Sequence, residues 1–136
     1  MDIYARSPLP SLTNRLLWEA IVDVSEVRAL GHGPLGERRI VPILGGEFRG
    51  GPELSDFHGV VLPGGADRQL IRADGGKELD ALYEMEVHDG TVLTIRNRVI
   101  IDETVDGPRY ALSRIEVTAP SGPWSWLSRR LIIGTL

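Results

Sequence analysis

Four residues in the middle of this sequence have side chains suited to proton transfer or to oxyanion stabilisation. They are Asp67 and Asp80 with their carboxylates, Tyr83 with its phenol and Asn97 with its amide. A carboxylate can remove a proton from a substrate, and a phenol or amide can stabilise the oxyanion that develops. The set therefore predicts a cofactor-independent step such as isomerisation, cyclisation, hydration or elimination, provided that the fold brings these groups together.

The segment 77–101 must position three of these four residues. Apolar residues occupy every second position up to residue 87, and the alternation resumes after Gly90, as in two strands that each bury one face. A three-residue loop at 88–90, with a type I turn and a bulge at Gly90, keeps cations off the apolar face. The pairs that this hairpin predicts are Tyr83 with Ile95, Met85 with Leu93, Ala81 with Asn97 and Asp80 with Arg98.

Tyr83 and Asn97 fall on the apolar face of this hairpin. An amide in such a place needs hydrogen-bond partners, because an unsatisfied buried polar group costs about 1 to 3 kcal/mol. Asn97 is predicted either to orient a ligand or to tie down a bulge or a neighbouring strand. Tyr83 is predicted either to donate a proton or hydrogen bond to a ligand, or to belong to the core with its hydroxyl at the rim.

Asp80, Arg96 and Arg98 fall on the polar face. Opposite charges across strands form ion pairs there that stabilise by only about 0.2 to 1 kcal/mol. If a pocket opens on this face, Asp80 becomes a candidate base and an arginine becomes a clamp for a carboxylate or enolate.

Asp67 and Gln69 follow a glycine-rich segment, 63–66, whose glycines permit a tight turn that aims them inward. Asp67 is otherwise a turn-capping residue. Trp126 is predicted to be core or pocket wall, on the face of the last strand opposite to Arg129.

Turn residues recur every eight to twelve positions and predict many short strands. About eight strands in one chain of 136 residues favour closure, which removes exposed edges. We therefore expect an all-β, single-domain antiparallel β-barrel over residues 16–136, after an N-terminal extension at 1–15. The remaining strands are expected at 16–24, chosen over a helix, and at 39–44, 57–62, 68–72, 109–118 and 126–133.

Composition argues against several classes of function. The net charge is −4 and like charges form no runs, which disfavours binding to nucleic acid or to an anionic membrane. The chain has no cysteine, and its three histidines lack metal-ligand spacing, so we expect no metal and no cofactor. Residues 1–14 have neither a signal-peptide nor an anchor pattern, which makes a cytoplasmic location the expectation.

Five blocks in order resemble the bacterial and fungal family known as domain of unknown function 3237. They are GERRIVPILGGEF at 36–48, VLPGGADRQ at 61–69, LDALY at 79–83, IRNR at 95–98 and WLSR at 126–129. The resemblance covers 16–134 and departs from the family pattern at Arg68, Leu82 and Ser128. It implies a small β-barrel with a cleft or lumen, often associated as homodimers, with no generally assigned activity.

Three hypotheses follow for function. The first is a barrel that binds a small, largely apolar organic molecule and acts on it as a cofactor-independent lyase or isomerase. Asp67, Asp80 and Tyr83 would be catalytic, and the substrate would contact Gln69, Arg96, Asn97, Arg98 and Trp126. The second is a carrier or sensor with the same pocket. The third is a structural barrel whose lumen is filled by side chains.

Overall fold

The computed structural model describes residues 10–104 and 106–136, most of which lie in strands. The predicted all-β antiparallel fold is confirmed, with nine strands instead of about eight. The predicted N-terminal extension falls outside the described residues for its first nine positions. The elements are β1 (Trp18–Val24), β2 (Arg28–Gly33), β3 (Gly36–Gly50), β4 (His58–Val61), β5 (Ala66–Arg72), β6 (Lys77–Val87), β7 (Val92–Asp102), β8 (Tyr110–Thr118), the 3₁₀ helix η1 (Ser125–Arg129) and β9 (Ile132–Thr135).

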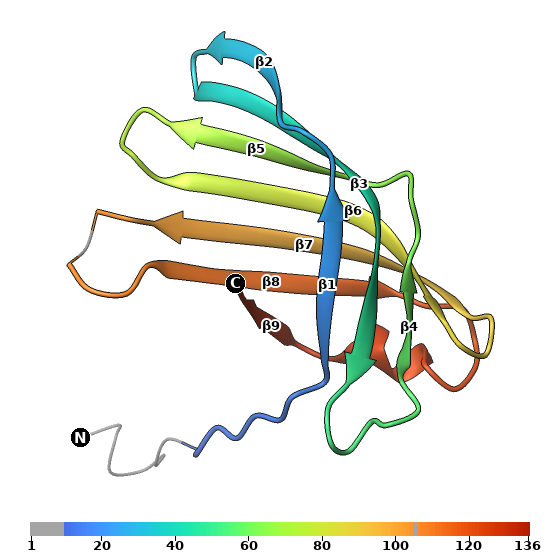
Figure 1. The fold of residues 1–136 in the computed structure, drawn as a ribbon. Helices are drawn as coiled ribbons and strands as arrows, with labels where there is room; N and C mark the ends of the chain where they lie inside the picture. Colours follow the sequence, from blue (N-terminus) through green and yellow to red (C-terminus); the bar gives the residue numbers. More distant parts are fainter. Residues whose placement is uncertain (1–9, 105) are drawn as a thin grey trace, which may run out of the picture.

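All nine strands belong to one curved, barrel-like sheet, with β5 to β9 paired in chain order (Figure 1). The long strand β3 is shared between two regions. Its first half pairs with β2 and β5, and its second half pairs with β1 and β4. Gly46 lies in the second half with φ +138°, and a Cβ there would collide with the backbone oxygen of Ile21. A glycine is therefore needed at this position of the β1–β3 ladder.

The β6–β7 hairpin has the predicted register at all four predicted pairs. Its loop is the predicted three-residue loop. Val87 and Thr91 close it through a hydrogen bond of 2.8 Å from the Val87 N–H, and the Gly90 N–H donates to the Val87 oxygen at 2.8 Å. Gly90 has φ +91°, as a bulge of this kind requires.

The elements differ from the sequence-based expectation at three places. β2 was not predicted, because 28–33 is exposed throughout and lacks apolar alternation. β3 is much longer than the predicted strand at 39–44, since it continues through Gly45 and Gly46. The predicted strand at 126–133 is wrong in its first half, where η1 forms through turn-type hydrogen bonds such as Leu127 N–H to the Trp124 oxygen at 3.1 Å.

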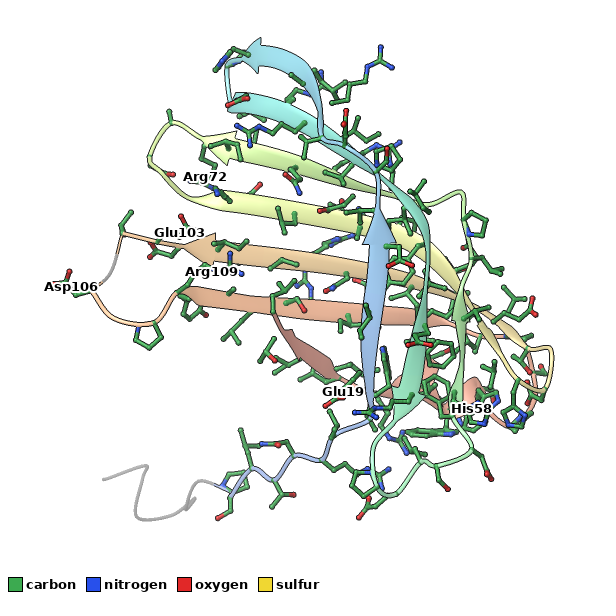
Figure 2. All side chains as sticks on the ribbon, in the orientation of Figure 1. Glu19, His58, Arg72, Glu103, Asp106 and Arg109 are labelled. Carbon is green, nitrogen blue, oxygen red and sulfur yellow. The ribbon has the colours of Figure 1, made fainter. Side chains whose placement is uncertain are left out.

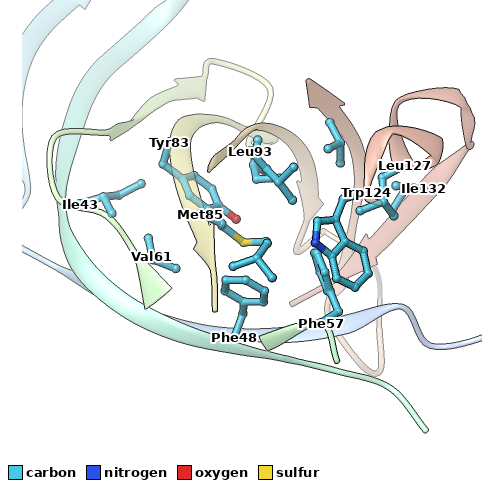
Figure 3. Packing of buried hydrophobic residues seen from close by; sticks show 13 residues of the cluster. Ile43, Phe48, Phe57, Val61, Tyr83, Met85, Leu93, Trp124, Leu127 and Ile132 are labelled. Carbon is cyan, nitrogen blue, oxygen red and sulfur yellow. The ribbon is translucent and has the colours of Figure 1, made fainter. Parts of the chain in front are cut away.

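The main core lies at one end of the sheet, which we call the core end (Figure 3). Phe57 is fully buried there and contacts the rings of Trp18, Phe48 and Trp124, with centroids 4.9 to 5.6 Å apart. A smaller cluster of Val99, Ile101 and Ala111 lies further along the same face. Much of the interior is therefore filled by side chains.

In the described part of the chain, β1 pairs with β3 alone and β9 pairs with β8 alone. A side-chain contact connects the residues just before β1 with η1. The Trp126 ring of η1 lies close to the guanidinium groups of Arg15 and Arg130, which are 5.8 and 5.5 Å from its centroid. Such contacts are favourable cation–π arrangements.

The opposite end of the sheet, which we call the turn end, carries the β5–β6 turn and the β7–β8 loop. Figure 2 shows Arg72, Glu103 and Arg109 at this end and Glu19 and His58 at the core end. Arg72 binds Asp74 at 2.8 Å, and Glu103 lies within 3.9 Å of both Lys77 and Arg109. In the described residues, no helix is long and apolar enough to cross a bilayer.

Candidate functional site

The candidate site lies on the inner face of the sheet, the face that carries the core residues Tyr83 and Met85. Side chains directly opposite each other across strands share a face. The register therefore forms two neighbouring inner rows between the core and the turn end. The first row is Asp67, Ala81, Asn97 and Ile115, and the second is Gln69, Leu79, Val99 and Ser113.

Asp67 is a half-buried carboxylate at the start of β5. The turn before it depends on Gly64, whose φ is +110°. Its Oδ2 accepts a hydrogen bond of 2.9 Å from Gln69 Nε2, whereas its Oδ1 is buried without a partner. Burial raises the pKa of Asp67 above its ordinary value, although the Gln69 hydrogen bond opposes the shift. A carboxyl in this state is a better general base than an exposed one.

Asn97 and Ser113 also present buried polar atoms without partners. Asn97 Oδ1 and Ser113 Oγ each lack a hydrogen bond, and Ser113 is only 6% exposed. Ser113 faces Gly134 across the β8–β9 ladder, where a Cβ would collide with the serine hydroxyl. Each such atom costs on the order of 1 to 3 kcal/mol if neither water nor a ligand bonds to it. Three such atoms on one face call for an explanation other than stability.

Ala81 lies directly between Asp67 and Asn97 in the first row. Adjacent strands are about 4.8 Å apart, so these two polar residues are separated by roughly 10 Å at the backbone. The methyl group of Ala81 fills little of the space between them. We call Asp67, Gln69, Asn97 and Ser113 the inner polar group, with Ala81 as its floor.

Asp80, Arg96 and Arg98 lie on the outer face, so the sheet separates them from the inner polar group. Arg96 binds Asp80 through two hydrogen bonds, of 3.1 Å from Nε and 3.0 Å from Nη2. This pairing lowers the pKa of Asp80. Of the two predicted catalytic aspartates, Asp67 and not Asp80 therefore has the properties of a base.

Tyr83 and Trp126 occupy the core end. Tyr83 is 5% exposed, and burial raises the pKa of its phenol to about 12. Such a phenol is a weak proton donor at neutral pH. Trp126 lies in η1 and packs against the main core, in an element separate from the three strands, β5, β7 and β8, that carry the inner polar group.

Three further polar residues of the inner face, Ser113, Arg39 and Glu37, are absent from the predicted site. Ser113 was predictable from the alternation of Ala111, Ser113 and Ile115 within the expected strand. Arg39 faces Gln69 across the β3–β5 ladder and is bound by Glu37 at 2.9 Å. The sequence indicates this pair only through the alternation of residues in the GERRIV segment. That segment forms the first part of β3, near the turn end.

Two hollows lie near the strand ends. One, of about 560 Å³, is lined at the core end by residues including Glu19, Arg49 and His58. The other, of about 350 Å³, lies at the turn end beside Lys77 and Ile101. Neither includes a member of the inner polar group. No cluster of three or more His, Asp or Glu residues in the described chain is placed to hold a metal ion.

Comparison with known proteins identifies relatives along almost the whole chain. Residues 12–136 match the model of the family described as "Protein of unknown function (DUF3237)". A UPF0311 protein of Rhodopseudomonas palustris strain TIE-1 is 32% identical over 143 aligned positions, which cover 93% of this chain and 88% of the relative.

Solved structures support the fold. The protein of unknown function RPA1785 from Rhodopseudomonas palustris superposes with a TM-score of 0.83 at 32% identity, over 93% of this chain and 89% of that one. A protein described as beta-barrel like, from Acinetobacter baumannii, gives a TM-score of 0.69 at 23% identity, over 93% and 90%. A protein described as an enzyme from Penicillium herquei gives 0.66 at 20% identity, over 93% and 88%. The last two likenesses concern the fold alone.

Proposed function

The chain belongs to the family described as protein of unknown function (DUF3237), and we propose that it binds a small organic molecule on the inner face, against the inner polar group. The observation that carries this proposal is the set of three buried atoms without partners, Asp67 Oδ1, Asn97 Oδ1 and Ser113 Oγ. A ligand with hydroxyl or N–H groups would satisfy them. The side chains of Asp67 and Asn97 are partly exposed, and the terminal torsion of an amide or carboxylate rotates easily. Small rotations therefore bring both oxygens to the surface.

The apolar neighbours of this group suit the body of such a molecule. Leu79 and Ile115 are partly exposed and flank Ala81 and Asn97 within the two rows. A ligand that lies over Ala81 contacts apolar carbon beneath it and polar atoms on either side. This combination of an apolar surface with a few converging polar groups is typical of small-molecule sites.

The reaction class that we propose is a cofactor-independent proton transfer, as in a lyase or isomerase. Asp67 accepts the substrate proton on its unpartnered Oδ1. The Asn97 amide N–H then donates to the oxyanion that forms on the substrate. Returning the proton from Asp67 to another substrate atom completes an isomerisation, and loss of a leaving group completes an elimination.

A second candidate function, a non-catalytic carrier or sensor, is favoured by the state of Tyr83. A phenol that is 5% exposed with a pKa of about 12 leaves Asp67 without the acid partner that the sequence suggested. A carrier needs only the hydrogen bonds.

Native mass spectrometry of the purified chain, followed by ¹H–¹⁵N correlation spectra with a library of small neutral hydroxyl compounds, tests the proposal. We expect shifts at the amides of the inner rows in the wild type. Asp80→Asn, one residue from Ala81 but on the outer face, is the matched control and should bind equally. Asn97→Leu should abolish the shifts. A library that moves none of the inner-row amides at millimolar concentration contradicts the proposal.

A compound that binds in this screen then distinguishes the enzyme from the non-catalytic carrier. Asp67→Asn keeps the shape and the Gln69 contact but removes the base. Retained binding with lost turnover of the bound compound supports the enzyme, whereas a wild type that binds without turnover supports the carrier.

We propose a cytoplasmic setting and, from the family resemblance, a homodimer. Sedimentation velocity at micromolar concentration tests the second point, and a species at the 14.9 kDa of one chain would contradict it.

A further inference from the structure

The outer face of β7 and β8 carries a square of four side chains. Arg98 is directly opposite Arg114, and two residues further along Ile100 is directly opposite Leu112. The register and the strand alternation place all four on the same face. Arg114 is exposed, and Ile100 and Leu112 are 63% and 38% exposed. We call these four residues the outer block.

The two positive charges of the outer block are only partly balanced by neighbouring carboxylates. Like charges directly opposite each other on a sheet are unfavourable. Arg98 Nη1 reaches Glu116 Oε1 only at 4.0 Å, and Asp80, which faces Arg98 from β6, is already bound bidentately by Arg96. Within the described residues, Arg114 has no carboxylate within 4.0 Å of its guanidinium group.

Arg98 also carries an unpartnered donor. Its Nε is buried and makes no hydrogen bond. A buried donor of a charged group without an acceptor is costly, more so than a neutral one. Two carboxylates, Asp80 and Glu116, therefore serve three guanidinium groups on this face, those of Arg96, Arg98 and Arg114, which leaves an excess of positive charge and of donors.

We propose that the outer block binds a phosphate monoester that carries an apolar group. The phosphate lies between the guanidinium groups of Arg98 and Arg114, whose planar donors match its oxygens. A dianion matches the two adjacent positive charges better than a monoanionic carboxylate does. The apolar group lies over Ile100 and Leu112, which removes their exposed surface from water.

This site is independent of the inner polar group, because the sheet lies between them. The ligand chemistry is shared by soluble phosphate monoesters and by the headgroup of phosphatidic acid. Two arms of one experiment therefore separate these sources.

The first arm is calorimetric titration of the full chain with hexyl phosphate, inorganic phosphate and hexanoate. We expect hexyl phosphate to bind most tightly and hexanoate about tenfold more weakly, through the loss of charge-assisted hydrogen bonds. Arg114→Glu should weaken hexyl phosphate binding by at least about tenfold. Arg28→Glu makes the same charge change on an exposed arginine of β2 and should leave the affinity unchanged.

The apolar half of the block has its own control. Ile100→Ser should weaken binding of hexyl phosphate several-fold and leave inorganic phosphate binding unchanged. A fall in both affinities would contradict the placement of the hexyl chain.

The second arm is cosedimentation with phosphatidylcholine vesicles that contain phosphatidic acid. Cosedimentation that Arg114→Glu abolishes assigns the site to a lipid headgroup, and binding of hexyl phosphate alone assigns it to a soluble ester. Equal affinity for hexanoate and hexyl phosphate, wild-type affinity in Arg114→Glu, or no binding in either arm overturns the proposal.

Discussion

The two faces of β5 to β8 differ in which hydrogen-bonding groups they lack: the inner face lacks donors and the outer face lacks acceptors. On the inner face, Asp67, Asn97 and Ser113 present buried oxygens without donors. On the outer face, Arg98 and Arg114 present guanidinium donors with too few acceptors. Asn97 and Arg98 are neighbours in the sequence, so a single step along β7 separates the two conditions.

The two aspartates of these strands show what the difference does to chemistry. Asp67 faces inward, where burial raises its pKa, while Asp80 faces outward, where the Arg96 hydrogen bond lowers its pKa. The same side chain is therefore suited to proton transfer on one face and to ion pairing on the other. The face of the sheet that each aspartate occupies therefore decides the direction of its pKa shift.

The sharpest test of the comparison uses two isoleucines of β7. Ile95 is completely buried on the inner face and Ile100 is 63% exposed on the outer face. Ile95→Ala should lower the free energy of unfolding by about 2 to 5 kcal/mol through lost burial and a cavity, and Ile100→Ala by less than about 0.5 kcal/mol. Urea unfolding measures both. Similar losses would mean that the two faces are not distinct.

Asn97→Leu tests whether the inner oxygens are retained at the expense of stability. Leucine removes the unpartnered acceptor and adds apolar contact beside Ala81, so we expect the free energy of unfolding to rise by about 1 kcal/mol. Ligand binding should be lost in the same variant. A decrease in stability would show that Asn97 has a structural partner, which would remove it from the proposed site.

Asp67→Asn tests the raised pKa through the pH dependence of stability. The folded state holds the Asp67 proton more tightly than the unfolded state does, so ionisation destabilises the wild type once the pH exceeds the unfolded value near 3.8. The variant should therefore melt about 2 to 4 °C higher at pH 7. The difference should vanish below the ordinary aspartate pKa. Thermal unfolding from pH 3 to pH 8 measures it, and a constant difference would contradict the assignment.

The smallest effect is expected on the outer face. Arg114→Glu places a carboxylate directly opposite Arg98 and replaces a repulsion with an attraction. We expect a gain of about 0.2 to 1 kcal/mol that shrinks at high salt. Urea unfolding at low and high salt checks it, with Arg28→Glu, on an exposed arginine of β2, as the control for net charge. A loss of stability would mean that Arg114 has a partner of its own.

The β6–β7 hairpin was predictable to the residue because two constraints agree. Apolar alternation fixes the faces, and the three-residue loop fixes the register. The inward orientation of Asn97 and the outward orientation of Asp80 followed from the same pattern. The glycine-rich turn left two alternatives for Asp67, an inward-facing carboxylate or a turn cap, and the β5–β6 register places it on the inner face.

Other features depended on contacts that alternation does not encode. β2 has no buried face and exists because its backbone pairs with β3. Trp126 and Leu127 are apolar enough for a strand, yet the turn that follows Gly122 coils them into η1. The repulsive Arg98–Arg114 pair required the β7–β8 register, which the intervening loop leaves undetermined in the sequence.

The sharing of β3 among four partner strands has a consequence for how the molecule opens. Releasing β3 breaks ladders to β1, β2, β4 and β5 at once, so its exchange with solvent deuterium requires unfolding of the whole domain. β1, β2 and β9 are each bonded along one edge only, so each can separate by itself and exchange early. Local opening of this molecule therefore begins at these three edge strands and leaves the ladders among β5, β6 and β7 intact.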